Sequence, residues 1–545
     1  MRSLLAALLA ALSPAAAQDC ETRTLIGRTL TGEGSAAGVS WSGAKITGVQ
    51  PQGTAGSASL PREGATDRCT TVLPNGAVIL PGLTDGHAHL LGIGLREMTL
   101  NLEGTASLAD LQDRVRAAAA ETPRGPVIGR GWIETGWPEG RMPMAADLDA
   151  VVSNRPVILT RADGHAAVVN TAALRAAGLG ADTPDPEGGR IVRDEDGAAT
   201  GLLIDAAMGL VSGLQPALTQ ARRREALRRG AALYASRGWT GLHNMSVDAE
   251  DLAVIADLAR RGQLPLRVAS YVTPDALTEV DGPECDATGR ACVVGVKLYA
   301  DGALGSRGAL LFEPYADEPE TTGLQLIGED AAKAIYDAAA EKDLQVTTHA
   351  IGDKGNALVL AWYRDVMPEG ARWRVEHAQV VRPKDIPAFA RQGVIASMQP
   401  SHAIGDLRFA PDRLGDARLD GAYAWASFQG TGAVVVGGSD APVEVGDPRI
   451  ELYAATKRRA LDGFRAENWR AREALSRDAA LRVFTRNPAY ALGEEGARGR
   501  IARGMAADLS VFCGDPFGGP GAATAILTVV DGEVIGTPPE ACPAE

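Results

Sequence analysis

Apolar and polar residues are arranged along the middle of the chain in two patterns that follow one another in turn. Short runs rich in Val, Ile, Leu and Ala, bounded by turn-forming residues, are typical of buried strands. Between most of them lie longer segments whose apolar residues recur every three or four positions, as in amphipathic helices. The strand candidates are AVILPGLTDGH, GWTGLHNMS, PLRVASYV, CVVGVKLYADG, LQVTTHAIGD, WRVEHAQV, GVIASMQPS and AVVVGGSDAP. The clearest helix candidates are EDLAVIADLARRG, EDAAKAIYDAAAEKD and KDIPAFARQ.

This alternation predicts an α/β fold, a TIM-like (β/α)8 barrel. An open doubly wound sheet is the alternative, but such sheets usually carry a glycine-rich phosphate loop after the first strand, and none follows here. The interval between the first and second strand, about residues 95–235, is far longer than an ordinary connection and has strand-like and turn-rich text of its own. We interpret it as a large insertion after strand 1.

Both ends of the chain read as short strands and turns. Before residue 81 stand runs such as RTLIGRTLTG, AKITGV and TVLPNGAVIL, and after residue 490 stand GRIARGMAADLSVF and ATAILTVVDGEV. The pattern predicts a small β-sandwich that both ends assemble together. The expected domains are a signal peptide at 1–17, the first part of the sandwich at 18–80, the barrel at 81–490 and the second part of the sandwich at 491–545.

The first residues, MRSLLAALLAALSPAAAQDC, have the three parts of a secretory signal. Arg2 supplies the positive charge, Leu4 to Leu12 the apolar stretch, and Ala15 to Ala17 a small-residue cleavage site. The apolar stretch is too short to span a bilayer, and no later segment is long enough. We therefore expect a periplasmic or secreted protein without a membrane span, with a mature start near Gln18.

Charge and cysteine content narrow the picture further. The net charge is −14 over 545 residues, which argues against a nucleic-acid partner, because phosphate binding needs a clustered basic surface. In an oxidising compartment the six cysteines predict disulfides rather than reactive thiols. Sequence alone leaves their connectivity open. The economical pairing is Cys285 with Cys292, Cys20 with Cys69, and Cys513 with Cys542.

Polar residues close several of the predicted barrel strands. His87 and His89 are two of only seven histidines, and at a spacing of two they point to the same face of a strand. This pair alone is weak, because a coincidental pair is about as common as a ligand pair. Four further strand ends carry Lys297, His349, His377 and Asp440. Since catalytic groups gather at the carboxyl ends of barrel strands, the set predicts a metal site.

Several motifs together resemble a known family. PGLTDGHAHL, GVKLYADGALGSR, THAIGD, VEHAQ and GGSDAP occur in order, with DGHAAVVNTAAL in the insertion and GRIARGMAADLSVF near the end. They are similar to the amidohydrolase superfamily, and within it to the amidohydrolase-3 branch of YtcJ-like proteins related to N-substituted formamide deformylase. The resemblance covers nearly all of the chain after the signal. It says little about the substrate, because this branch is broad.

The resemblance implies a centre with two divalent metal ions. His87 and His89 would bind the more buried ion. His349 and His377 would bind the more exposed one. Zinc is the default for hydrolytic sites rich in histidine, and manganese, iron and cobalt stay open.

Two further residues receive roles from the same resemblance. Lys297 matches a lysine that becomes carboxylated and bridges both ions. An ammonium group cannot bind a cation, whereas the carbamate formed from a free amine and CO₂ is an anionic oxygen ligand. Asp440 matches an aspartate that binds metal and transfers protons, so it would act as a catalytic residue.

Five other residues are expected to face the substrate or to shape its surroundings. His402 follows strand seven and would bind the substrate carbonyl or its developing oxyanion, as a second catalytic residue. The expected substrate-binding residues are His165 and Trp132 in the insertion, and Asp301 and Arg307 in the loop after strand four.

The predicted function is that of an exported, metal-dependent amidohydrolase. It would cleave a non-peptide C–N bond of a small-molecule amide or formamide by a metal-activated hydroxide. One alternative within the same barrel is a mononuclear deaminase or D-aminoacylase-like hydrolase, with Lys297 uncarboxylated. Another is a non-catalytic periplasmic binding protein, against which the complete ligand set argues. No sequence feature decides whether the protein is a homo-oligomer.

Overall fold

The computed structural model describes residues 20–30, 35–51, 69–134, 136–162, 164, 166–186 and 188–543. The expected signal peptide and the start at Gln18 lie outside these residues. The chain forms two compact units. The first contains Met1–His89, Ala231–Ala441 and Val445–Glu545, and the second contains Leu90–Gly230 with Pro442–Glu444.

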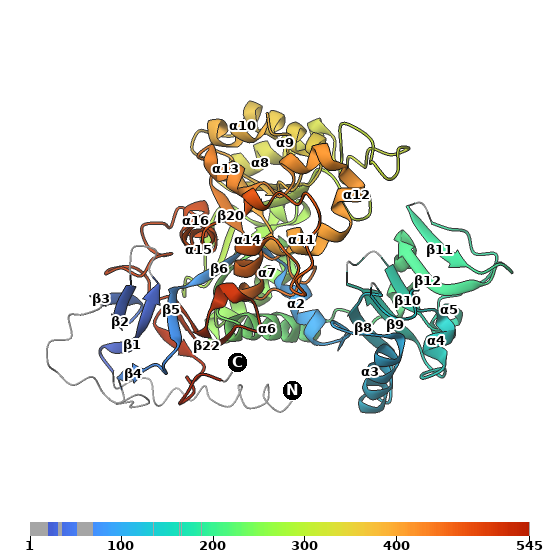
Figure 1. Ribbon diagram of the computed structural model, residues 1–545, viewed down its shortest axis with the longest axis horizontal. Coiled ribbons are helices and arrows are strands. Elements are labelled where there is room, and N and C mark those ends of the chain that lie inside the picture. The colour runs from blue at the N-terminus through green and yellow to red at the C-terminus, as the bar shows by residue number, and fades with distance from the viewer. Residues whose placement is uncertain are drawn as a thin grey trace. The chain divides into compact units, whose positions relative to one another are not determined.

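Eight parallel strands of the first unit form a nearly closed barrel whose spatial order follows the chain order (Figure 1). This confirms the predicted TIM-like fold. The barrel strands are β6 (Leu83–Ala88), β13 (Trp239–Val247), β14 (Arg267–Val272), β16 (Ala291–Tyr299), β17 (Gln345–Ala350), β18 (Arg374–His377), β19 (Ile395–Met398) and β20 (Val435–Gly437). A two-residue strand, β15 (Glu284–Cys285), pairs with β16 in the antiparallel direction.

Helices alternate with these strands, as the periodicity predicts. They are α6 (Gln220–Ser236), α7 (Ala249–Arg260), α8 (Glu329–Ala340), α9 (Asp353–Val366), α10 (Ile386–Gln392), α11 (Pro400–Gly405), α12 (Ala410–Leu414), α13 (Trp425–Gly430), α14 (Pro448–Lys457), α15 (Arg477–Val483) and α16 (Arg486–Ala491). Local signals set their ends. The Asp248 side chain caps the first turn of α7, and Gly393 ends α10 in the left-handed conformation.

The first strand candidate, AVILPGLTDGH, is divided between two sheets. Its first half forms β5 (Ala77–Pro81), which pairs with the small sheet described next, and its second half forms β6 of the barrel. The break falls at Gly82, where a Cβ atom would lie 2.5 Å from Thr240 Oγ1 and 2.8 Å from Asp508 Cβ. Only glycine fits at this close approach, and the chain changes sheets there.

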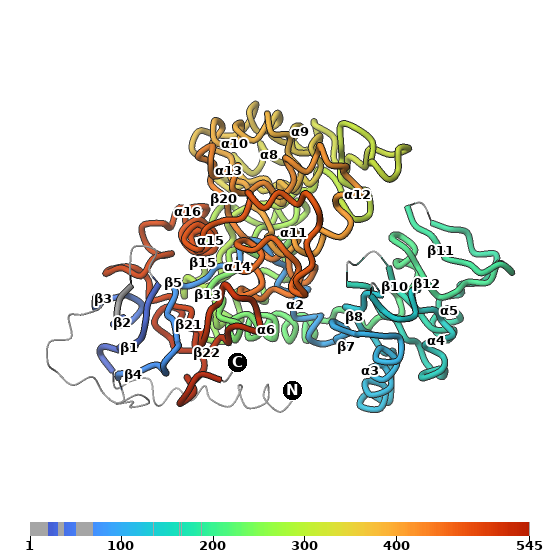
Figure 2. Tube along the Cα trace, viewed as in Figure 1, coloured from blue at the N-terminus to red at the C-terminus, as the bar shows by residue number. Residues whose placement is uncertain are grey.

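Strands from both chain ends lie side by side in one sheet, with the blue and red segments adjacent in Figure 2. Strand β21 runs antiparallel to β5, with Leu509 opposite Pro81. Apolar side chains of both ends, such as Trp41 and Val511, share one core. The strands are β1 (Arg23–Leu30), β2 (Ser35–Ser42), β3 (Lys45–Pro51), β4 (Thr70–Val72), β5, β21 (Leu509–Gly514), β22 (Ala523–Val530) and β23 (Glu533–Ile535).

The second unit has its own sheet and its own apolar core. Its strands follow the spatial order β11-β12-β10-β9-β8-β7. They are β7 (Leu100–Asn101), β8 (Val127–Trp132), β9 (Val157–Arg161), β10 (Ala166–Val169), β11 (Gly189–Arg193) and β12 (Ala199–Asp205). The helices are α2 (Leu90–Glu97), α3 (Leu108–Glu121), α4 (Ala145–Asp149) and α5 (Thr171–Ala176).

All six cysteines form disulfides, and the pairing is the one named as most economical from the sequence. Cys20 bonds to Cys69, Cys285 to Cys292 and Cys513 to Cys542. Three disulfides indicate an oxidising compartment. Within the described part of the chain, no helix combines the length and the apolar character needed to cross a bilayer.

Candidate metal centre

The predicted ligands lie at the carboxyl-terminal ends of five barrel strands. Five of the six side chains are buried, and His89 is partly exposed. His87 lies on β6 with His89 just after it, Lys297 on β16, His349 on β17, His377 on β18, and Asp440 just after β20. The barrel therefore brings to one end residues that are up to 353 positions apart in the chain (from 87 to 440).

Three of these side chains approach one another closely. The Nε2 atoms of His87 and His89 lie 3.2 Å and 3.0 Å from the same atom, Oδ1 of Asp440. Two ligands in a tetrahedron with bonds of about 2.0–2.1 Å are separated by about 3.3 Å, so the spacing suits the shell of one ion. His377 joins the group, since ligand atoms of His87, His377 and Asp440 all lie within 4.8 Å of one another.

The second ring nitrogen of each of three histidines is held by an acceptor. Nδ1 of His87 lies 2.5 Å from Oε2 of Glu376, and Nδ1 of His377 lies 2.8 Å from Oε1 of Gln399. Nδ1 of His89 donates to the carbonyl oxygen of Met245 over 3.1 Å. A proton fixed on Nδ1 leaves the lone pair on Nε2, the atom that faces the centre.

His349 is oriented the other way. Its Nε2 lies 3.5 Å from the carbonyl oxygen of Gly302 and 3.4 Å from Oδ1 of Asp301, so Nδ1 is the nitrogen left for an ion. Its ring centroid lies 4.4 Å from that of His377. On the neighbouring strand, Nζ of Lys297 lies 4.5 Å from the centroid of the Tyr299 ring.

Burial sets the protonation states in this cluster. It lowers the pKa of His89, and with Lys297 nearby it lowers the pKa of His349 to about 3. Burial and the adjacent His349 place the pKa of His377 well below its usual range. Burial opposes the ionisation of Asp440, but the charge of His87 and hydrogen bonds to His87 and His89 hold its pKa well below normal. Neutral imidazoles and an ionised carboxylate are the forms that bind cations.

The backbone is strained at two of the ligands. His377 and Asp440 have φ angles of 72° and 58°, in the left-handed region that residues with a side chain rarely adopt. Such conformations cost about 1–3 kcal/mol each and cluster at functional sites.

A hydrogen-bonded seam joins the first and last barrel segments below the ligands. Asp85, two residues before His87, accepts from the backbone nitrogen and the hydroxyl of Ser439 over 2.9 Å and 2.6 Å. A Cβ atom at Gly86 would lie 2.6 Å from the carbonyl oxygen of Gly437, which explains the glycine in DGHAH. The seam thereby fixes His87 beside Asp440.

His402 lies beside this cluster on α11. Its Nε2 is buried and, within the described residues, has no hydrogen-bond partner; it lies 3.7 Å from Oδ2 of Asp440. Its ring stacks on that of His377 with centroids 5.8 Å apart. Nε2 of His87 is likewise buried, and it faces Oδ1 of Asp440 at 3.2 Å. The imidazole nitrogens of His87 and His89 beside one carboxylate oxygen suit a divalent metal ion, with zinc as the usual choice.

Asp301 and Arg307 shape the loop after β16. The buried carboxylate of Asp301 accepts from the backbone nitrogens of Leu310, Ile351 and Gly352 over 2.7–2.9 Å. Burial nevertheless raises the pKa of Asp301 to about 7. Arg307 pairs with Asp317 at 2.9 Å. These contacts hold the loop to itself and to the end of β17, and Oδ1 of Asp301 also lies 3.4 Å from Nε2 of His349.

The other predicted substrate residues belong to the second unit. Trp132 is completely buried and packs in the core of that unit, and its Nε1 donates to the carbonyl oxygen of Leu159 over 2.8 Å. His165 lies outside the described residues.

Sequence reasoning missed several residues that surround the ligands. Glu376 and Gln399 hold the rings of His87 and His377, and Tyr299 covers Lys297. The hydroxyl of Tyr299, whose side chain stays 40% exposed, lies 2.7 Å from that of Ser246. One available signal was the motif RVEH, in which two charged residues alternate along a strand predicted to be buried.

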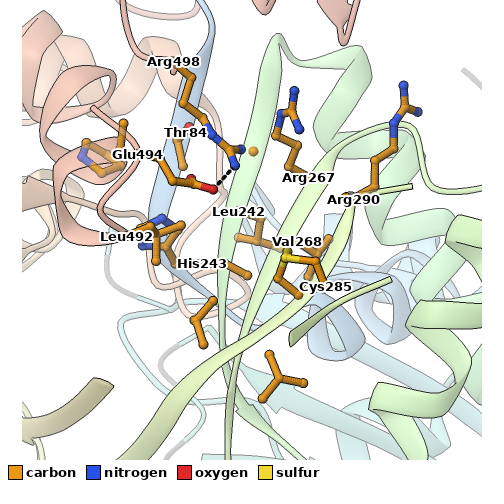
Figure 3. A pocket seen from close by; sticks show the side chains of 18 of the residues that line it. Thr84, Leu242, His243, Arg267, Val268, Cys285, Arg290, Leu492, Glu494 and Arg498 are labelled. Carbon is orange, nitrogen blue, oxygen red and sulfur yellow. Dashed lines mark hydrogen bonds and ion pairs between the residues drawn. A yellow bond between two sulfur atoms is a disulfide. The ribbon is translucent and has the colours of Figure 1, made fainter. Parts of the chain in front are cut away.

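A cavity of about 210 Å³ lies among the amino-terminal ends of the barrel strands (Figure 3). His243, Arg267 and Cys285 line it, and Arg498 forms an ion pair with Glu494 at its edge. None of the six predicted ligands is among its lining residues, so the cavity is separate from the histidine cluster.

Comparisons with known proteins show which family this chain belongs to. The pattern of the amidohydrolase family matches residues 75–535. YtcJ of Bacillus subtilis (strain 168) is 34% identical over 483 residues, which cover 85% of this chain and 89% of that protein. The N-substituted formamide deformylase of Arthrobacter pascens is 26% identical over 463 residues, covering 81% of this chain and 84% of the relative.

A solved structure is similar over nearly the whole length. It is the crystal structure of an uncharacterized metal-dependent hydrolase from Pyrococcus furiosus, with a TM-score of 0.72 and 27% identity. The match covers 91% of this chain and all of the other.

Proposed function

Because this chain belongs to the amidohydrolase family, we propose that it is a metal-dependent hydrolase that cleaves a non-peptide C–N bond in a small amide or formamide. The observation that carries the proposal is the approach of two imidazole nitrogens to one carboxylate oxygen, at 3.2 Å and 3.0 Å. The name of the Arthrobacter relative, a deformylase of N-substituted formamides, supports this class of substrate.

The ligands divide between two ions in this proposal. His87, His89 and Asp440 would hold the first. His349, through Nδ1, and His377, through Nε2, would hold the second. Zinc is the expected metal at both positions, since imidazole nitrogen and carboxylate oxygen are its common ligands.

Lys297 is proposed to bridge the two ions as a carbamate. Lys297 is 1% exposed, and its positive charge acts against protonation of both His87 and His349, which supports a place near both sets of ligands. An ammonium group at this position would repel cations, whereas an anionic carbamate stabilises them.

The remaining chemistry comes from the side chains of the chain itself. Metal ions bound here would lower the pKa of water and polarise a substrate carbonyl. Asp440 accepts a proton from the attacking water and transfers it to the leaving nitrogen, because its ionised carboxylate lies at the centre. His402 directs its unsatisfied Nε2 to the substrate carbonyl and stabilises the negative charge that develops on its oxygen.

One observation favours a second candidate. His87, His377 and Asp440 form a compact set of three possible ligands, which is enough for one ion in a catalytic site. A mononuclear deaminase or D-aminoacylase-like hydrolase would use such a set and leave Lys297 unmodified. Metal content separates this candidate from the binuclear one.

We also propose that the protein works outside the cytoplasm, in the periplasm or as a secreted protein. The signal-like first 17 residues and the three disulfides support this location.

The test is hydrolysis by protein prepared with zinc and bicarbonate. A panel of N-substituted formamides, N-acyl amino acids, cyclic amides and carbamates is supplied, and the released amine is measured. We expect turnover of at least one amide class, its loss on treatment with a chelator, and its return with zinc. A metal-loaded protein that binds members of the panel and hydrolyses none would support a binding protein instead.

A further inference from the structure

A buried ion pair lies inside the barrel, beneath the histidine cluster. Arg374 and Glu376 are two residues apart on β18, so both side chains point into the barrel, and each is completely buried. Nε of Arg374 lies 2.8 Å from Oε1 of Glu376, and Nη2 donates to Oε2 over 3.2 Å. The interior of such barrels is usually filled by apolar side chains, so two opposite charges here need a reason.

Glu376 links this pair directly to a predicted metal ligand. Its Oε2 accepts from Nδ1 of His87 over 2.5 Å, and its Oε1 accepts from the hydroxyl of Thr347. The guanidinium of Arg374 contacts both oxygens of this carboxylate, at 2.8 Å and 3.2 Å, and balances its charge. An ionised carboxylate at Nδ1 fixes the proton of His87 there and makes Nε2 a stronger ligand.

Arg374 also fixes the backbone next to the same histidine. Nη2 donates to the carbonyl oxygen of Gly86 over 2.7 Å, one residue before His87. The guanidinium therefore reaches His87 twice, through its backbone and, by way of Glu376, through its ring. In all, its hydrogen-bond partners are on five barrel strands: Gly86 on β6, His243 on β13, Tyr271 on β14, Glu376 on β18 and Ser397 on β19.

The contact with His243 determines the tautomer of that residue too. A guanidinium can only donate, so Nδ1 of His243, 2.8 Å from Nη1, must accept and its proton must be on Nε2. Burial and the Arg374 charge place the pKa of His243 well below its usual range. His243 on β13 is thus a neutral imidazole that accepts a hydrogen bond from Arg374 and helps to hold its guanidinium in place.

The stability of the fold alone does not explain why a charged pair is buried here. A buried ion pair is often no more stabilising than apolar residues of the same volume, because both charges lose their hydration. Here the contact of Glu376 with Nδ1 of His87 and that of Arg374 with the carbonyl oxygen of Gly86 both fix the position of one imidazole ring.

We propose that Arg374 and Glu376 are positioning residues that fix the tautomer and the orientation of His87 for metal binding. The inference rests on the proposed function, since it assumes that His87 is a ligand. It extends that function by assigning the metal affinity of the centre to two residues that do not themselves contact the ion.

The test measures metal affinity rather than turnover. Full-length wild-type protein is compared with Glu376→Gln, with Arg374→Met, and with the double variant. Glutamine keeps an acceptor for His87 but removes its charge. Arg374→Met alone leaves the buried carboxylate of Glu376 without its partner, and this variant can fail to fold. The double variant removes both charges, so we expect it to fold and to be measurable in the same assay. The control is Arg290→Met, at a buried arginine whose partners are Leu264, Val530, Asp531 and Glu533.

The readouts are the zinc dissociation constant from competition with a coloured chelator, the visible absorption spectrum of the cobalt-loaded protein, and thermal unfolding of the metal-free protein. We expect zinc affinity to fall about 10- to 100-fold in the Glu376→Gln and double variants, with altered cobalt bands, and the control to bind as the wild type does.

Two results would overturn the inference, and they differ. If the wild type binds zinc and the folded variants bind it equally tightly with the same cobalt spectrum, the pair is only structural. If the wild type takes up no metal at all, the proposed function fails, and this inference fails with it.

Discussion

Each of four histidines at the centre has one ring nitrogen near an acceptor and the other turned to its neighbours. The strand-end positions of these residues could be predicted from sequence, because a polar residue that closes an apolar run is visible in one dimension. Their ring partners could not be predicted. Met245, Glu376 and Gln399 reach the rings from strands or loops far apart in the chain, and only the closed barrel shows these contacts.

A substitution at Asp440 tests its proposed role in proton transfer. We expect Asp440→Asn to lower kcat about 10²- to 10⁴-fold, because the amide cannot accept a proton at neutral pH. Steady-state kinetics on the substrate found by the amide panel measure this, with metal content determined on the same sample. The matched control is Asp365→Asn, at an exposed carboxylate that pairs with Lys333. Unchanged kcat in the Asp440 variant would remove this residue from the chemistry.

At the scale of elements, the order and type of the barrel strands followed from sequence, and one boundary did not. The run from Ala77 to His87 reads as one strand, but Gly82 divides it between two sheets. The division depends on the close approach of Thr240 and Asp508, which are more than 150 residues away in the chain. Hydrophobic periodicity predicts which residues are buried, but it does not predict which of two sheets a buried residue belongs to.

The loop after β16 depends on one carboxylate. We expect Asp301→Ala to lower the free energy of unfolding by about 3 kcal/mol or more, because three buried backbone nitrogens would lose their acceptor, at about 1–3 kcal/mol each. Urea unfolding monitored by circular dichroism measures the change. Arg307→Ala, in the same loop, removes a partly exposed pair and should cost no more than about 1 kcal/mol. Equal losses in the two variants would contradict the role given to Asp301.

At the scale of the whole molecule, the two chain ends meet in one sheet, and the disulfide between Cys513 and Cys542 together with that between Cys20 and Cys69 constrains it. Both β-rich ends could be predicted from their short apolar runs separated by turn-forming residues. Their strand order could not, because the pairing of β21 with β5 joins segments more than 400 residues apart.

Acid should release the metal. Burial and Lys297 lower the pKa of His87, but Asp440 and Glu376 outweigh them, so in the metal-free protein this pKa lies above its usual value of about 6.5. A proton on His87 competes with an ion, so affinity is highest above this pKa and falls as the pH drops through it. Metal retained after dialysis at pH 8, 7, 6 and 5 should decrease in that order. Equal retention throughout would show that His87 is not a ligand.

The central claim is that this barrel holds a pair of metal ions at His87, His89, Lys297, His349, His377 and Asp440. Its most direct test is the metal content per chain of protein purified with bicarbonate present, determined by elemental analysis. The account predicts about two equivalents of divalent metal, and about one equivalent in a Lys297→Met variant. A wild-type chain that binds no metal, even after zinc is supplied to the folded protein, would contradict it.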